Sequence, residues 1–163
     1  MTSEELSTTR PGDSRQLTAG EVELAHSVFG DAIDYARVRI FRRKYFPLQP
    51  RNRTMAPNGN IYFHPRSLAY RDDFSTAGTC LKGLFIHEMT HVWQHQGGTN
   101  VRRAIFNRRY RYKLVRGKSF RRYGLEQQCE IVRDYFLVSC RPAAHRSLEH
   151  FEDILPFIDK RNA

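Results

Sequence analysis

The stretch that decides the fold of this chain is Cys80-Leu-Lys-Gly-Leu-Phe-Ile-His87-Glu88-Met-Thr-His91-Val-Trp-Gln-His95. Histidines four positions apart lie one turn apart on the same helix face, so His87 and His91 can reach one divalent ion. Imidazole nitrogen suits zinc, and a zinc with three protein ligands keeps a fourth position for water, whose pKa it lowers to about 7. Glu88 can then take a proton from that water. The H-E-x-x-H pattern therefore predicts a zinc site with Glu88 as general base.

Apolar residues around this motif recur every three or four positions, which predicts a helix that Gly97-Gly98 ends: Leu81, Leu84, Phe85, Met89, Val92 and Trp93. The competing interpretation is a core helix whose two histidines are only hydrogen-bonded or exposed. We favour the metal site, because a chance pair of histidines would not usually come with a helix of the right length around it.

A zinc site needs at least one more protein ligand than these two histidines. His95 lies on the same helix but about 12 Å from His87 along the axis, at a rise of about 1.5 Å per residue. The extended H-E-x-x-H-x-x-G-x-x-H pattern is also absent, since Gln94 stands where its glycine belongs. The third ligand is therefore expected from another element.

A second helix is predicted over residues 125–138 from the helical spacing of its apolar residues. Three acidic residues, Glu126, Glu130 and Asp134, follow at intervals of four and share one face of it. Such a face could supply the third ligand and a carboxylate that orients an imidazole, or it could be a solvated face that pairs with arginines. We expect Glu126 to be the ligand, with Glu130 second and Cys129 third. Asp134 or Glu130 is the candidate for the orienting carboxylate.

The composition indicates one domain with a core of its own. The chain has 163 residues, of which 40% are hydrophobic, and a net charge of +10. We expect residues 1–15 to be a flexible N-terminal lead and residues 16–163 to form the domain. The three cysteines form no C-x-x-C pair, so reduced thiols are expected. We find no apolar run long enough for a membrane span or a signal peptide, which predicts synthesis in the cytoplasm.

Shorter elements are predicted ahead of the metal helix. Thr18 and Glu21 have the spacing of a capping box, which predicts a first helix ending near Gly30. The segment 35–44 alternates apolar and basic residues as a half-exposed strand does. A second strand is expected over Ile61 to His64, after a turn signal, with His64 as an ordinary polar residue at its end. In zinc peptidases an extended substrate commonly pairs with a strand edge beside the metal, and this strand is our candidate for that edge.

Residues 101–123 carry ten basic side chains interleaved with aromatic ones. Such a strip could bind nucleic acid, because cations attract phosphates and aromatic rings stack on bases. We favour a solvated connection between two helices, because the segment contains no recognised nucleic-acid module. A binding module that docks nucleic acid or an acidic partner without catalysis remains the main alternative to an enzyme.

Several further motifs accompany Ile86-His-Glu-Met-Thr-His-Val-Trp-Gln94, namely Phe46-Pro-Leu-Gln-Pro-Arg-Asn52, Asn58-Gly-Asn-Ile-Tyr-Phe-His-Pro65, Tyr70-Arg-Asp-Asp-Phe-Ser75 and Tyr123-Gly-Leu-Glu-Gln-Gln-Cys-Glu-Ile-Val-Arg-Asp-Tyr-Phe136. Together they resemble the Vgr-related zincin-like proteins, which are similar to metallopeptidase domains at the C-terminal end of type VI secretion VgrG-type spike proteins. The resemblance implies a gluzincin-type site with Glu126 as third ligand. It also implies an antibacterial effector that travels with a spike protein into a target cell and has a cognate immunity protein.

We therefore expect a compact α+β, zincin-like (gluzincin) domain, in which a small sheet lies beside the H-E-x-x-H helix and a second helix supplies a ligand. The expected function is a Zn²⁺-dependent metallopeptidase acting on a peptide or protein substrate, with zinc on His87, His91 and Glu126 and with Glu88 as the catalytic base. A zinc amidase acting on cell-wall peptides is a further alternative. The residue that stabilises the developing oxyanion is expected among Tyr110, Tyr112 and Tyr123.

Overall fold

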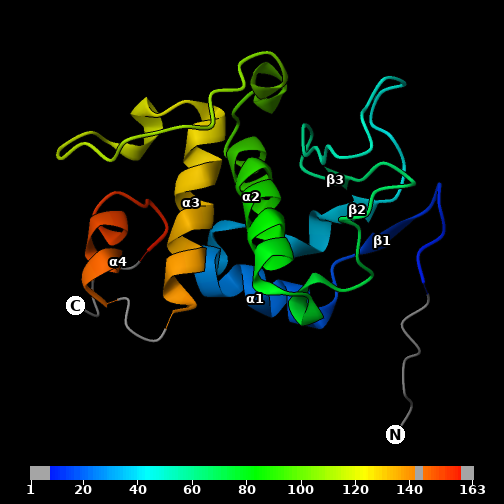
Figure 1. The fold of residues 1–163 in the computed structure, drawn as a ribbon, viewed down its shortest axis with the longest axis horizontal. Helices are drawn as coiled ribbons and strands as arrows, with labels where there is room; N and C mark the ends of the chain where they lie inside the picture. The colour runs from blue at the N-terminus through cyan, green and yellow to red at the C-terminus, as the bar shows by residue number, and fades with distance from the viewer. Residues whose placement is uncertain (1–7, 142–144, 159–163) are drawn as a thin grey trace, which may run out of the picture.

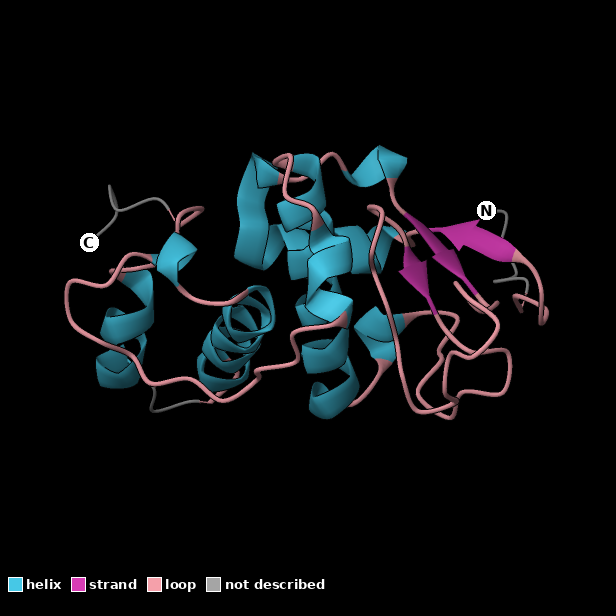
Figure 2. Ribbon diagram, turned by 90° about the horizontal axis from the view of Figure 1, so that it is seen from above, coloured by secondary structure: helices cyan, strands magenta, loops and turns pink. Residues whose placement is uncertain are grey.

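The computed structural model describes residues 8–141 and 145–158. It is an α+β fold with one small sheet and several helices, as the sequence predicts. The elements are β1 (Ser14–Gln16), α1 (Ala19–Phe29), β2 (Arg39–Phe41), β3 (Ile61–Tyr62), α2 (Thr79–Gln96), α3 (Leu125–Ser139) and α4 (His145–Glu152). Helices α2 and α3 run side by side, with the sheet beyond α2 and α4 beyond α3 (Figures 1 and 2). Within the described ranges no helix is long and apolar enough to cross a membrane.

Helix α1 begins at the capping box that its sequence predicts. The Thr18 hydroxyl accepts a hydrogen bond from the Glu21 backbone N–H at 3.1 Å, and a Glu21 carboxylate oxygen accepts one from the Thr18 N–H at 2.9 Å. The helix ends at Gly30, whose φ of +53° is a conformation that residues with a side chain rarely adopt. Both predicted ends of this helix are confirmed.

The sheet has the order β1-β2-β3, with β1 antiparallel to β2 and β2 parallel to β3. The strand predicted within residues 35–44 is shorter than expected, because Tyr35–Arg37 form a 3₁₀ turn ahead of β2. The predicted edge is also displaced. Strand β3 covers only Ile61–Tyr62, and Tyr62 exchanges two backbone hydrogen bonds with Met55, at 2.7 and 3.1 Å. The segment around Met55 therefore takes the outer position that we expected Ile61 to His64 to hold.

Part of the N-terminal lead that we expected over residues 1–15 pairs with the rest of the fold. Ser14–Gln16 pair with β2, and ahead of them the Gly12 N–H donates to the Arg42 carbonyl at 2.9 Å. The Thr9 N–H donates to the Asp72 carboxylate, also at 2.9 Å. These backbone groups have tertiary partners, which a polar sequence alone does not reveal. Residues 1–7, the rest of the expected lead, lie outside the described residues.

Stacked aromatic rings fix α2 relative to the sheet. Phe63, directly after β3, stacks on Phe74 with a ring-centroid distance of 5.3 Å, and Phe74 stacks on Phe85 of α2 at 5.6 Å. All three rings are almost fully buried. Each contributes apolar burial and a ring-pairing preference of about 1 kcal/mol. Helix α2 is thereby held beside the segment that carries Met55.

Helix α3 approaches α2 closely because α2 carries a glycine at their contact. A Cβ added at Gly83 would lie 3.1 Å from a methyl group of Leu137 on α3, so a larger residue there would push the helices apart. The two helices run antiparallel, and Figure 1 shows the first turn of α3 beside the C-terminal end of α2. That first turn carries Glu126.

Candidate metal centre

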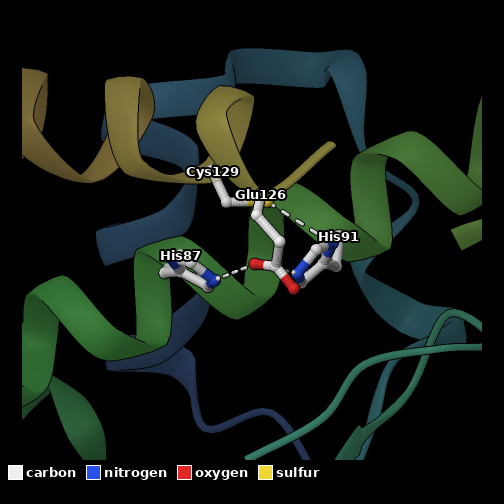
Figure 3. Close-up of side chains that lie close together, drawn as sticks. All are labelled: His87, His91, Glu126 and Cys129. Carbon is white, nitrogen blue, oxygen red and sulfur yellow. Dashed lines mark hydrogen bonds and ion pairs between the residues drawn. The ribbon is translucent and has the colours of Figure 1, made fainter. Parts of the chain in front are cut away.

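The structure brings together the three residues that the sequence predicts as ligands. His87 and His91 project from α2 and Glu126 from the first turn of α3, and all three side chains are buried. One carboxylate oxygen of Glu126, Oε2, lies 3.2 Å from His87 Nε2 and 3.3 Å from His91 Nε2. In Figure 3 this carboxylate points between the two imidazole rings. The arrangement follows from the spacing of four residues in α2, which turns both rings to the same side.

Each imidazole is oriented through its other nitrogen. His87 Nδ1 lies 2.8 Å from a Glu130 carboxylate oxygen, and His91 Nδ1 lies 2.9 Å from the Gln94 side-chain oxygen. The Gln94 amide nitrogen in turn donates to the Leu125 carbonyl at 3.1 Å. Partners of this kind fix the ring orientation of metal-binding histidines. Both Nε2 atoms are therefore directed at Glu126.

Of the two carboxylates expected to orient an imidazole, Glu130 is the one that contacts a predicted ligand. Asp134 instead accepts a hydrogen bond from the Tyr112 hydroxyl. Glu130, expected as the second choice of ligand, meets His87 on the nitrogen that faces away from Glu126. Its position is that of a group that holds a ligand ring.

Cys129 belongs to the same cluster. The ligand atoms of His87, His91, Glu126 and Cys129 all lie within 4.8 Å of one another, so this group could hold a metal ion. The thiol sulfur lies 3.4 Å from His91 Nδ1, beside the nitrogen that Gln94 already contacts. Burial raises the pKa of the Cys129 thiol well above its ordinary value, which favours the protonated form, whereas the thiolate is the metal-binding form. The sulfur therefore packs behind His91, and Glu126 occupies the side that both Nε2 atoms face.

The cluster is strongly charge-coupled. Burial alone would lower the pKa of His87, but hydrogen bonds to Glu126 and Glu130 outweigh it and raise the pKa to about 10. Burial alone would raise the pKa of Glu126, but hydrogen bonds from the two imidazoles lower it to about 2. A divalent cation has the charge to take the place of the proton that His87 holds in this cluster.

Glu88 lies beside the two histidines with an unsatisfied carboxylate oxygen. The side chain is 4% exposed, and its Oε2 has no hydrogen-bond partner among the described residues. Burial raises the pKa of this carboxyl, against the opposing effect of His87 and His91. The residue lines a cavity of about 50 Å³ together with His87, His91 and Glu126. A buried carboxylate without a partner in a cavity is typical of a functional group rather than of a structural one.

Of the three tyrosines expected near the reacting carbonyl, the structure places Tyr110 at this cavity. Its ring centroid lies 6.4 Å from that of His87. The Tyr112 hydroxyl donates to Asp134, and the Tyr123 hydroxyl accepts from the Val115 N–H at 3.0 Å. Those two hydroxyl groups are thus engaged elsewhere.

The other two histidines that we weighed lie away from the cavity. His95 is exposed and packs over the turn at Gly59, where an added Cβ would lie 2.7 Å from its ring. His64 accepts a hydrogen bond from the Arg66 N–H at 3.0 Å, directly beyond β3. Neither belongs to the cluster that could hold a metal ion.

Sequence reasoning missed the segment 53–57, which lines the cavity opposite α2. It also missed Gln49, whose buried amide holds that segment, because nothing in a loop sequence indicates which tertiary partners it meets. The role of Gln94 was detectable, because a residue three positions after a histidine lies within reach of its ring on a helix.

Comparisons with known proteins confirm the link to type VI secretion VgrG proteins. No family model matches the chain. The chain is 48% identical over 132 residues, 76% of its length, to the type VI secretion system spike protein VgrG2b of Pseudomonas aeruginosa, and it spans 13% of that protein. Its structure is similar to the effector domain of P. aeruginosa VgrG2b, with a TM-score of 0.77 and 40% identity, covering 93% of this chain and 86% of that one.

Proposed function

We propose, from the premise that this chain belongs to the family of the VgrG2b effector domain, that it is a zinc metallopeptidase of the zincin-like, gluzincin type. The observation that carries the proposal is the position of one Glu126 oxygen between the Nε2 atoms of His87 and His91. Two imidazole nitrogens and one carboxylate oxygen are the donor set of catalytic zinc sites of this type.

The residues present fit a zinc ion. His87, His91 and Glu126 would hold it, and their second partners, Glu130 and Gln94, keep the two rings in place. When bound, zinc acts as a Lewis acid and lowers the pKa of a coordinated water. The unpartnered Oε2 of Glu88 supports the same conclusion, because a base that works on water and substrate needs a free oxygen beside the ion.

The chain's own groups supply the proton transfers and part of the charge stabilisation. Glu88 Oε2 takes a proton from the attacking water and passes it to the amine that leaves when the peptide bond breaks. Glu88 is buried, so its carboxylate acts in a medium of lower dielectric than bulk water. Tyr110, half exposed at the rim, is placed to donate a hydrogen bond to the carbonyl oxygen as it becomes negative.

The relatives support a role in type VI secretion. We take the chain to be an effector made in the cytoplasm and delivered with a VgrG-type spike protein into a target cell. A cognate immunity protein would then protect the producing cell from this enzyme. Because the chain spans only 13% of the spike protein it matches, the activity and partners of that whole protein enter here as proposals.

The experiment compares the wild type with Glu88→Gln, which keeps the shape of the side chain and removes its basicity. Zinc is measured by mass spectrometry on both proteins, and both are assayed on a peptide library and by expression directed to the periplasm. We expect equal zinc content and a loss of about 10²- to 10⁴-fold in turnover, with loss of toxicity. Equal activity in the two proteins would refute the proposal.

The same assay separates the alternatives. Peptidoglycan fragments run beside unfolded protein substrates identify an amidase by which set is cleaved. A binding module would bind nucleic acid or an acidic protein with a steep loss of affinity as salt rises, and would not respond to a chelator.

A further inference from the structure

We infer that Arg53 determines substrate specificity by binding a carboxylate of the substrate, so that preferred peptides carry an acidic side chain close to the bond that is cut. The inference rests on the proposed function, because it names the substrate class of the same site.

Arg53 lies between two adjoining pockets. It lines the cavity that contains His87, Glu88 and His91, and also an adjoining pocket of about 350 Å³. Both pockets share His87, Glu88 and Tyr110. A peptide whose scissile bond lies over Glu88 therefore has a neighbouring side chain in one of these two pockets. In either pocket that side chain lies beside Arg53.

The backbone of Arg53 is fixed by a buried amide. Gln49 is 3% exposed, and its amide nitrogen donates to the Arg53 carbonyl at 2.8 Å and to the Tyr62 carbonyl at 3.1 Å. Its oxygen accepts from the Tyr45 N–H at 2.7 Å. Two residues further on, Met55 pairs with Tyr62 beside β3. Because the backbone is held this firmly, only the side chain of Arg53 has to be ordered when a substrate binds.

The two carboxylates that contact the imidazoles are paired with residues other than Arg53. Glu126 contacts both imidazoles, and Glu130 contacts His87 and, at 3.4 Å, Arg133. The Arg53 guanidinium has no hydrogen bond or ion pair with any residue in the described part of the chain, although it is half buried. A planar guanidinium in this state matches the two oxygens of a carboxylate, and such charge-assisted pairs are the stronger hydrogen bonds of proteins.

A different role for Arg53 would act through Glu88. Burial raises the pKa of the Glu88 carboxyl, and the charge of Arg53 opposes that rise together with His87 and His91. An arginine acting only in this way would change the turnover of every peptide by the same factor. A carboxylate-binding arginine changes the ratio between an acidic peptide and its amide counterpart.

The test measures binding on zinc-loaded full-length Glu88→Gln protein, which does not consume its ligand. Two fluorescein-labelled, C-terminally amidated octapeptide pools are compared by fluorescence anisotropy, identical except that one carries Glu where the other carries Gln. We expect the Glu pool to bind about tenfold more tightly, the lower range for a charge-assisted pair that is partly exposed. Adding Arg53→Gln should bring the ratio to about one. Arg51→Gln, an exposed arginine of the same loop, should leave it unchanged.

A charge-reversal variant distinguishes a true loss of selectivity from a loss of binding caused by misfolding. Arg53→Glu should favour a third pool, with Lys at the same position, over the Glu pool, which a disrupted protein would not do. A Glu pool that binds no better than the Gln pool, including the case in which neither binds, overturns the inference. A preference for the Glu pool that persists in Arg53→Gln also overturns the inference.

Cleavage assays with the same pools and wild-type Glu88 keep the two proposals apart. If the wild type cleaves neither pool, the peptidase proposal fails while the binding ratio still decides the role of Arg53. If Arg53→Gln lowers turnover on the Glu and Gln pools equally, the residue acts through Glu88 and the selectivity inference is wrong.

Discussion

Two buried carboxylates of this protein, Glu21 and Glu88, have opposite surroundings. Each oxygen of Glu21 accepts two hydrogen bonds, one from the Arg15 guanidinium at 2.7 Å and one from a backbone N–H, that of Thr18 or of Phe74, at 2.9 Å. Glu88 has one oxygen without any partner among the described residues. Both side chains are almost fully buried, so burial alone does not distinguish them. The difference is that the protein supplies hydrogen-bond partners for both oxygens of Glu21, whereas one oxygen of Glu88 is left to interact with a bound molecule.

The same contrast extends to the charges around each group. Arg15 and Glu21 form a bidentate pair in which a cation meets an anion. Beside Glu88, Glu126 contacts both imidazoles and Glu130 contacts His87, and the cluster has the ligand atoms for a cation. A buried carboxylate oxygen without a partner, such as Glu88 Oε2, costs stability, and proteins retain such groups where they are used. The first region therefore holds the fold together, whereas the second carries the chemistry.

The largest expected effect separates the two regions by stability. Glu21→Gln removes the charge that meets Arg15 and should lower the free energy of unfolding by about 3 kcal/mol, because the guanidinium, 14% exposed, loses the anion that it pairs with. Urea denaturation followed by circular dichroism measures the loss. The exposed Glu23→Gln on the same helix should change it by less than about 0.5 kcal/mol. A Glu21→Gln protein as stable as the wild type would show that the pair is not structural.

Glu126→Gln should instead weaken the binding of zinc. It removes the carboxylate between the two imidazoles, so zinc affinity should fall by more than about a hundredfold, the upper end for residues that only support a ligand. Competition with a chromophoric chelator measures the affinity, and Glu149→Gln, an exposed glutamate of α4, is the matched control. Unchanged zinc binding in Glu126→Gln would remove the predicted third ligand.

Glu130→Gln is expected to have a smaller effect on the same measurement. Its carboxylate touches only the outer nitrogen of His87, so zinc affinity should fall by about 10- to 100-fold while zinc still binds. If Glu130→Gln weakened zinc more than Glu126→Gln, the assignment of ligand and supporting residue would have to be exchanged.

A change of one pH unit has the smallest expected effect. In the absence of metal, hydrogen bonds to Glu126 and Glu130 outweigh burial and raise the pKa of His87 to about 10, so this imidazole holds a proton at neutral pH. Zinc must displace that proton, and its affinity should therefore rise by about tenfold per pH unit between about pH 6 and 8. Calorimetry in buffers of different ionisation enthalpy should show about one proton released per zinc from His87. A zinc affinity that stays constant over this pH range would contradict the pairing of His87 with Glu126 and Glu130.

The predictable part of the molecule is the part whose geometry is local. A spacing of four residues fixes the relation of His87 to His91, and a capping box fixes the start of α1 at Thr18. The helix bearing Glu126 also follows from its own periodicity. Whether that helix packs against α2 is decided by tertiary contacts such as the close approach at Gly83.

The parts that sequence reasoning missed depend on pairings between distant segments. Met55 takes the outer side of Tyr62 because Gln49 holds the loop, and Arg15 reaches Glu21 because β1 pairs with β2. In a one-dimensional pattern Gln49 and Arg15 are ordinary polar residues. The position of Arg53 at the cavity follows from the same loop, and it was equally invisible in the sequence.

The most direct test of the metal centre is X-ray absorption at the zinc edge on the zinc-loaded protein. We predict a first shell made only of nitrogen and oxygen at about 2.0–2.2 Å, from His87, His91, Glu126 and water. A sulfur scatterer at about 2.3 Å would place Cys129 on the ion in a closed, structural site. That result, or a protein that retains no zinc, would contradict the catalytic centre proposed for this chain.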